Sequence, residues 1–513
     1  DGGLPTALPM PQAGSGVYAG ESAIFYTPLA RDFRTWKRYE GGWAQDLWLF
    51  DLERNEARAL TTDPRTDRDP MWIDGMGYFA SDRGENGRLN LYRVDPDSGA
   101  VEALTAHADW DVRWPADDGQ GRIVYTHGGA LRILDVTTND DRRLTIRVPD
   151  DGVNRRVRTA DVSDQIGGAW LSPTGERVLF YARGDLFNAP AESGVTRPLT
   201  RSSDAHEREA AWAPDGRHVA WISDAEGEEA LYIAPVDGRG EPRRLSSPER
   251  TRLYAPRFSP DGEHIAYSDK DGFIYVQAVD GGEPESVGRD PSWRNRDYSW
   301  SPSGRYLAFS LTGSNQLRAL YVHDVRSGRT RQISEGLFSE YQPAFSPDGQ
   351  HLFFLADREF APQISGREWN FATNRVTGAF AYALTDEAPN PFAPEDSSDG
   401  GILADEEETE DEDANEQADV TIEFEGLARR IIRVPVGASN YQDLWAVEGG
   451  LLLAEIDAFY YGRGWETPPR LKRFDFANEE MSTLVEGIGS ADLSADGKKL
   501  LTRQGSQWHV RVL

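Results

Sequence analysis

One short pattern recurs through this chain: an aromatic or apolar residue, then usually Ser-Pro or Ala-Pro, a polar residue and glycine. Proline presets φ for the first corner of a turn, and glycine accepts the positive φ that follows. The residues after each turn alternate between apolar and polar, as a half-buried strand requires. Each copy therefore predicts two strands joined by a tight turn. The copies begin at Trp170, Trp212, Phe258, Trp300 and Phe345, with a weaker one at Leu493.

The spacing of these copies constrains the fold more than any single copy does. From Trp170 to Phe345 consecutive copies lie 42, 46, 42 and 45 residues apart. A period in the forties, with several short strands per period and almost no helical pattern, is typical of the blades of a β-propeller. The sequence therefore predicts an all-β chain made of consecutive propellers.

The blade pattern divides the chain into two parts. Three blade-like units fill residues 20–146, and seven follow residue 160. Residues 147–160 carry no blade pattern, so we expect them to cross from one propeller to the next. The predicted domains are thus 1–146 and 161–513, joined by a crossing segment at 147–160.

Three segments depart from the blade pattern or interrupt it. Residues 1–20 are rich in Gly, Pro and Ala and are expected to form a loop, and 360–394 is expected to be irregular. Residues 395–420 carry a block of like charges that repel one another, which predicts a disordered acidic loop. The alternative is that these acids bind calcium, but they are not accompanied by the glycine-containing spacing of ligands that a calcium loop has. Strands are expected to resume at 420–424.

The composition excludes several classes of partner and chemistry. A formal net charge of −31 argues against nucleic acid and anionic membranes as partners. No apolar run approaches the length of a membrane span. Because the chain has no cysteine, it contains no thiolate nucleophile and no cysteine-based metal site.

The sequence offers few groups for catalysis. His218, His264 and His351 each follow a turn glycine, which predicts that they begin strands. A Gly-x-Ser-x-Gly nucleophile motif is missing. The pairs Ser81-Asp82 and Ser223-Asp224 predict turns in which the Asp accepts neighbouring backbone N–H groups. We therefore predict no catalytic residue, no cofactor and no metal site within this chain.

One basic insert stands out in so acidic a protein. Four cations alternate with aromatic residues between Arg31 and Tyr39. Such a cluster is suited to grip a peptide carboxylate or an acidic neighbouring domain. The alternative is an arginine-rich loop that is solvated or paired locally. The residues predicted to line a substrate path or a domain contact are Arg31, Arg34, Trp36, Lys37, Arg38 and Tyr39.

Several longer motifs resemble a known family. They are Trp36-Lys37-Arg38-Tyr39-Glu40-Gly41-Gly42, Asp46-Leu47-Trp48, Thr66-Asp67-Arg68-Asp69-Pro70-Met71-Trp72, Tyr78-Phe79-Ala80-Ser81-Asp82-Arg83, Asn90-Leu91-Tyr92, Glu368-Trp369-Asn370-Phe371 and Pro389-Asn390-Pro391-Phe392. Together they resemble the propeller region of the tricorn protease family, over nearly the whole chain. The Ser-Pro-Asp-Gly turns alone are less specific, since TolB-like and prolyl-oligopeptidase propellers share them.

The resemblance implies a six-bladed propeller, of which residues 1–146 would be the last blades, and a seven-bladed propeller over 161–513. PDZ and serine-protease domains would follow beyond residue 513 and hold the catalytic residues. The propellers would filter unfolded peptides and channel them to the active site of a homo-oligomeric, cytoplasmic peptidase; a periplasmic location is the alternative.

Two other functions remain open at this stage. A TolB-like propeller would bind a protein partner without catalysis. A dipeptidyl or oligopeptidyl peptidase would need a Gly-x-Ser-x-Gly motif in an α/β-hydrolase domain downstream.

Overall fold

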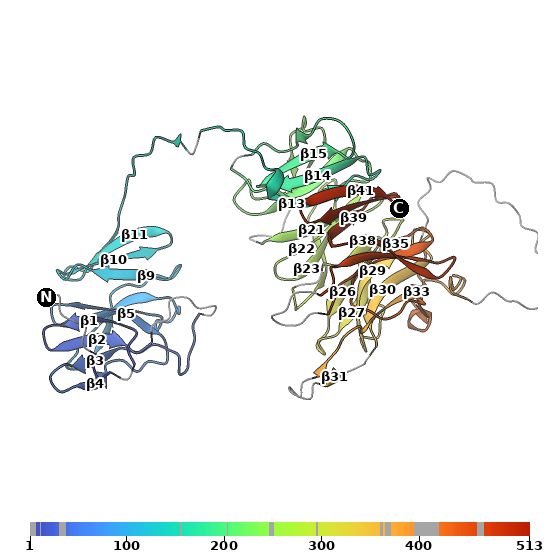
Figure 1. The fold of residues 1–513 in the computed structure, drawn as a ribbon. Coiled ribbons are helices and arrows are strands. Elements are labelled where there is room, and N and C mark those ends of the chain that lie inside the picture. The colour runs from blue at the N-terminus through green and yellow to red at the C-terminus, as the bar shows by residue number, and fades with distance from the viewer. Residues whose placement is uncertain are drawn as a thin grey trace, which may run out of the picture. The chain divides into compact units, whose positions relative to one another are not determined.

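The computed structural model divides the chain into two compact units, residues 1–158 and 159–513 (Figure 1). In the described residues, the regular elements are strands apart from 3₁₀ turns at Ser163–Gln165 and Leu427–Arg429. This confirms the predicted all-β fold, while the numbers of blades and the predicted domain limits stay predictions. The residues that the structure describes are 7–10, 12–29, 37–153, 156–202, 204–245, 251–293, 296–359, 363–364, 371–393, 420–458 and 466–513.

In its described residues the first unit contains three four-stranded antiparallel sheets. Within each sheet the strands pair in chain order. The sheets are β1 (Ser15–Ala19) to β4 (Glu56–Ala59) through β2 (Ala23–Thr27) and β3 (Trp48–Asp51); β5 (Asp67–Ile73), β6 (Met76–Ser81), β7 (Asn90–Val94) and β8 (Val101–Ala103); and β9 (Arg113–Asp117), β10 (Arg122–His127), β11 (Ala130–Asp135) and β12 (Asp140–Arg143).

The described part of the second unit contains six four-stranded sheets, one three-stranded sheet and a short ribbon, β31 (Gln363–Ile364) with β32 (Phe371–Ala372). The first four sheets are β13 (Ile166–Leu171), β14 (Arg177–Ala182), β15 (Asp185–Pro190) and β16 (Arg197–Pro198); β17 (Arg208–Trp212), β18 (His218–Ser223), β19 (Ala230–Pro235) and β20 (Arg243–Arg244); β21 (Leu253–Phe258), β22 (His264–Asp269), β23 (Phe273–Ala278) and β24 (Glu285–Arg289); and β25 (Ser299–Trp300), β26 (Tyr306–Thr312), β27 (Arg318–Asp324) and β28 (Arg329–Gln332). The last three are β29 (Ser339–Phe345), β30 (His351–Asp357), β33 (Thr377–Ala383) and β34 (Ile431–Arg433); β35 (Tyr441–Val447), β36 (Gly450–Glu455), β37 (Arg470–Asp475) and β38 (Glu480–Glu486); and β39 (Ile488–Leu493), β40 (Lys499–Gln504) and β41 (Gln507–Val512).

The repeated turn has the geometry that its sequence predicts. In the third sheet of the second unit, the N–H of Gly262 donates to the carbonyl of Ser259 at 2.9 Å, and Gly262 has a φ of +76°. The Ser259 hydroxyl accepts the N–H of His264 at 2.9 Å, and His264 is the first residue of the next strand. His218, His264 and His351 each begin a strand, as predicted.

The second unit closes on itself. First strands of neighbouring sheets contact one another from β13 through β17 to β21 and from β25 through β29 to β35, and β39 of the last sheet contacts β13 of the first; Figure 1 shows β39 and β41 in red beside β13 in green. Leu501 packs against Leu171, and Trp508 lies edge-on to Phe180 with ring centroids 5.9 Å apart. The seven sheets therefore form a ring, with their first strands innermost.

Three local predictions were wrong. Part of the segment expected to be a loop, Ser15–Ala19, is strand β1, because pairing with β2 overrides its weak strand propensity. Within the segment expected to be irregular, Thr377–Ala383 is the fully buried strand β33, paired with β30. Residues 420–424 form no strand; Val420 and Ile422 instead pack into the core as irregular chain. Of the predicted acidic loop, residues 395–419 lie outside the described residues.

Candidate functional site

The structure describes half of the basic insert. Arg31, Arg34 and Trp36 lie outside the described residues, whereas Lys37, Arg38 and Tyr39 lie within them. The guanidinium of Arg38 donates to the Asp111 carboxylate at 2.7 Å, and the Lys37 ammonium lies 3.6 Å from the same carboxylate. These two cations thus pair locally; their role in a substrate path or a domain contact stays a prediction.

Asp111 is the acceptor that organises this cluster. Its side chain is only 4% exposed, and it also accepts the N–H of Leu89 at 3.1 Å. Burial by itself would raise the pKa of Asp111, but the Leu89 N–H and the Arg38 and Lys37 charges outweigh burial and lower it. The carboxylate is therefore ionised at neutral pH and holds the insert to the neighbouring sheet.

A buried acid at the start of the first strand recurs in both units, and it escaped the sequence analysis. The Arg83 guanidinium donates to Asp67 at 2.5 Å, and the Arg358 guanidinium donates to Glu340 at 2.5 Å. In both cases the arginine lies two residues after the residue that pairs with the acid on the neighbouring strand. The motif Ser-Asp-Arg at 81–83 was the only sequence signal that could have indicated it.

One sheet lacks the arginine of this pair. Glu207 occupies the acid position before β17, and Ala225 stands where Arg83 and Arg358 stand in their sheets. The carboxyl group of Glu207 instead accepts the Ser202 hydroxyl at 2.5 Å. Burial raises its pKa.

The turn aspartates accept backbone N–H groups, but the donors are residues distant in the chain and not the neighbouring residues that the sequence predicts. Asp82 accepts the N–H of Thr66 at 2.9 Å, and Asp224 accepts the N–H of His206 at 2.7 Å. Both donors precede the first strand of the sheet, so each aspartate anchors the entry to that strand rather than activating a nucleophile.

Carboxylates also join first strands across the seams of the second unit. Asp297 accepts the N–H of Gln342 at 2.8 Å, Asp492 accepts the N–H of Leu171 at 2.7 Å, and Glu209 accepts the N–H of Ala255. Charge-assisted hydrogen bonds of this kind are stronger than neutral ones. They hold the inner ring of the second unit in one arrangement.

A cavity of about 620 Å³ lies between the second and third sheets of the second unit. It is lined by residues of two successive turns, among them Pro214, Asp215, Phe258 and Pro260. Within it the His218 Nδ1 lies 2.7 Å from the Asp215 carboxylate. The lining mixes apolar and charged groups, and it holds no nucleophile activated by this histidine.

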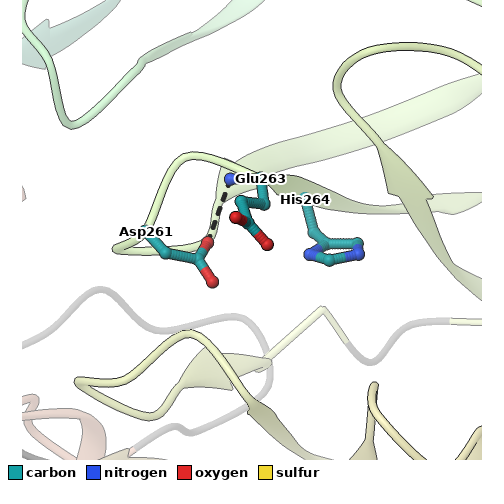
Figure 2. A group of neighbouring side chains, drawn as sticks. All are labelled: Asp261, Glu263 and His264. Atoms are coloured by element: carbon teal, nitrogen blue, oxygen red, sulfur yellow. Dashed lines mark hydrogen bonds between the residues drawn. The ribbon is translucent and has the colours of Figure 1, made fainter.

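Next to this cavity, Asp261, Glu263 and His264 offer ligand atoms within 4.8 Å of one another. Figure 2 shows the three side chains on one turn, with the N–H of Glu263 donating to the Asp261 carboxylate at 3.0 Å. The same oxygen of Asp261 accepts the Ser259 hydroxyl. Both carboxylates are exposed. We therefore assign these hydrogen bonds to the turn and assign no metal to the group.

In the described part of the chain, no helix has the length and apolar character that crossing a membrane requires.

Comparison with known proteins covers both units. The family model described as the tricorn protease second beta propeller domain matches residues 166–512, and that of the tricorn protease N-terminal beta propeller domain matches residues 1–140. Each model falls within one of the two compact units.

Individual relatives extend beyond this chain. Tricorn protease homolog 1 of Streptomyces coelicolor is 29% identical over 98% of this chain and 48% of its own length. The tricorn protease homolog of Saccharolobus solfataricus is 23% identical over 92% of this chain and 42% of its own length. The chain thus spans about half the length of the curated relatives that it matches.

A solved crystal structure of the tricorn protease has the same fold, with a TM-score of 0.69 and 18% identity over 98% of this chain and 47% of that one. Since one family model alone covers more than half of the residues, the chain belongs to the tricorn protease family and contains its propeller domains.

Proposed function

We propose that this chain is the non-catalytic propeller portion of a tricorn-like serine peptidase, which filters unfolded peptides and channels them to a catalytic domain beyond residue 513. The observation that supports this most directly is that both matching family models describe propeller domains of a protease and together cover nearly the whole chain. In this proposal the chain selects the substrate, and the catalytic domain hydrolyses it.

The inner ring of the second unit suits such a filter physically. Its first strands are tied to one another by carboxylates such as Asp297 and Asp492, so the ring resists widening. A rigid ring admits an extended chain and excludes a folded domain. A peptide held within it reaches the active site at high effective concentration.

The partners in this proposal are unfolded polypeptides and the protein's own PDZ and protease domains, in a cytoplasmic homo-oligomer. The insert residues Arg31, Arg34, Trp36, Lys37, Arg38 and Tyr39 would contact a peptide or a neighbouring domain. Arginines suit this role because their planar guanidinium binds carboxylates through two hydrogen bonds.

The mass of the protein from its natural source tests the first part of the proposal. A mass far above the 57.2 kDa of this chain is expected. A mass near 57.2 kDa would overturn the peptidase and favour the TolB-like propeller that binds a partner without catalysis.

Labelling tests the filter itself. Because this chain has no cysteine, Ser299→Cys adds one thiol to inner strand β25, and Ser482→Cys adds one to the exposed outermost strand β38. A bulky maleimide on Ser299→Cys is expected to slow hydrolysis of an unfolded polypeptide by the full-length protein, and the same label on Ser482→Cys is not. Equal rates in both variants would overturn the filter.

A further inference from the structure

One level of the inner ring carries charges of opposite sign on opposite sides. In the third sheet Arg257 is the first residue to pair after the bulge in β21. In the sixth sheet Asp443 is the first residue to pair after the bulge in β35. In the seventh, Asp492 immediately precedes the residue that enters the turn, as Arg257 does in its own strand. The equivalent residues of the second, fourth and fifth sheets are small, Ala211, Ser299 and Ala344, and that of the first sheet is Trp170.

The order of the sheets places these charges across the ring from each other. The ring is closed between the seventh and first sheets by the hydrogen bond from Leu171 to Asp492. Counted forward along the ring, the sixth sheet is the third after the third sheet, and counted backward, the seventh sheet is the third before it. Arg257 therefore faces the seam that carries Asp443 and Asp492. The equivalent residues in the two sheets that flank Arg257 are the small Ala211 and Ser299, which do not block its long side chain.

The electrostatics agree with this placement. Burial raises the pKa of Asp492 to about 6, and the Arg257 charge lowers it. Burial also raises the pKa of Asp443, and Arg257 again opposes the shift. Arg257 thus lies within electrostatic reach of two carboxylates that belong to other sheets, 186 and 235 residues further along the chain.

The arginine keeps more free hydrogen-bonding capacity than the acids. Arg257 is exposed; its guanidinium donates to the carbonyl of Tyr298 at 3.2 Å and lies over the Tyr298 ring. A guanidinium has five N–H donors. By contrast, Asp443 already accepts the amide of Gln342 at 3.0 Å, and Asp492 accepts a backbone N–H. A second exposed guanidinium, that of Arg296, stacks on Tyr254 beside it, 3.5 Å from the ring centroid.

We propose that Arg257, Asp443 and Asp492 form an electrostatic latch across the axis of the second unit, and that Arg257 binds the carboxylates of an extended acidic peptide that displaces it from the two aspartates. The proposal rests on the proposed function, because an unfolded peptide is the ligand. It adds a preference for acidic segments at this level of the ring, set by bidentate recognition of carboxylates.

Peptide binding to the 513-residue chain tests the preference. The probes are two labelled peptides, one in which glutamate alternates with serine and one in which glutamine replaces glutamate. The acidic peptide is expected to bind about tenfold more tightly, the usual effect of a charged hydrogen bond. Arg257→Ala removes this difference and Arg257→Lys keeps part of it. Asp443→Asn with Asp492→Asn tightens binding of the acidic peptide, because the competing carboxylates are gone.

The matched control is Arg289→Ala, on the outermost strand of the same sheet, where Arg289 stacks on Phe273. This variant is expected to discriminate between the peptides as the parent does. Discrimination that survives Arg257→Ala, or that is lost equally in Arg289→Ala, would overturn the proposal.

A second measurement separates the latch from the peptide path. NMR titration of ¹³C-labelled aspartate is expected to show a higher apparent pKa for Asp492 in Arg257→Ala than in the parent, and an unchanged one in Arg289→Ala. If neither peptide binds but the pKa rises, the latch stands and the proposed peptide path fails. If the pKa does not change, the latch itself is overturned.

Discussion

The carboxylate of Asp492 accepts the backbone N–H of Leu171 at 2.7 Å, across 321 residues of chain. This hydrogen bond joins the first strand of the last sheet to the first strand of the first sheet in the second unit. The ring is thus closed by a charged acceptor as well as by the apolar contacts of Leu501 and Trp508. Closure of this kind removes the exposed sheet face that an open ring would present to water.

The first prediction concerns the pH dependence of this seam. The folded-state pKa of Asp492 is raised to about 6, so its contribution to stability is largest below the unfolded value of about 3.9 and is lost as pH rises through 6. Relative to Asp492→Asn, the parent should therefore lose about 1 kcal/mol of opening free energy between pH 5.5 and 8. Hydrogen exchange of the amides in β13 and β39 measures it. An identical difference between the two proteins at both pH values would contradict the assignment.

The second prediction compares two buried acids at equivalent positions. Arg358→Ala leaves Glu340, 3% exposed, without its cation and should destabilise the fifth sheet by about 3 kcal/mol. Glu207→Gln removes a carboxyl that pairs with no arginine among the described residues and whose pKa burial raises. Because the pKa of Glu207 is raised in the folded state, the parent loses stability as pH rises and the acid ionises. The stability of Glu207→Gln relative to the parent should therefore be greater at pH 8 than at pH 5.5. Hydrogen exchange of β30 and β18 tests each, and opposite signs are expected.

The third prediction concerns the basic insert. Arg38 is paired with the buried carboxylate of Asp111. Arg38→Ala should therefore lower the opening free energy of the second and third sheets of the first unit by about 1–2 kcal/mol. The neighbouring Lys37, whose side chain is 63% exposed, serves as the control, and Lys37→Ala should cost less than about 0.5 kcal/mol. Exchange rates of the β7 and β10 amides report the difference. Equal effects of the two variants would show that Asp111 does not depend on Arg38.

In the fourth prediction, two turn glycines with the same backbone conformation behave differently. Gly175 and Gly216 have φ values of +69° and +64°, and alanine at either position costs about 1 kcal/mol for that reason alone. A Cβ on Gly175 would also lie 2.5 Å from the side chain of Lys499 in the last sheet, whereas a Cβ on Gly216 meets nothing within 4 Å. Gly175→Ala should therefore lower the thermal unfolding midpoint more than Gly216→Ala does. If Gly175→Ala lowered the midpoint no more than Gly216→Ala does, the Lys499 side chain would move aside at no cost in stability.

Part of the candidate site was accessible from the sequence. The insert around Arg38 was found because its cations and aromatics contrast with the acidic chain, yet its partner Asp111 lies 73 residues away and no local pattern links the two. The pairs of Asp67 with Arg83 and of Glu340 with Arg358 were missed because each acid reads as an ordinary polar residue before a strand. Only strand pairing brings the acid and the arginine together.

The sequence by itself determined the local units of this protein. The turn at 258–262 and the strand start at His264 follow from proline, glycine and alternating side chains, whose conformational preferences act within a few residues. The tertiary structure alone decided that strand β33 pairs with β30 in the fifth sheet, and that Arg257 faces Asp443 and Asp492. Those relationships depend on register and on closure of the ring, which bring together residues distant in the chain through packing and hydrogen bonds that no local propensity encodes.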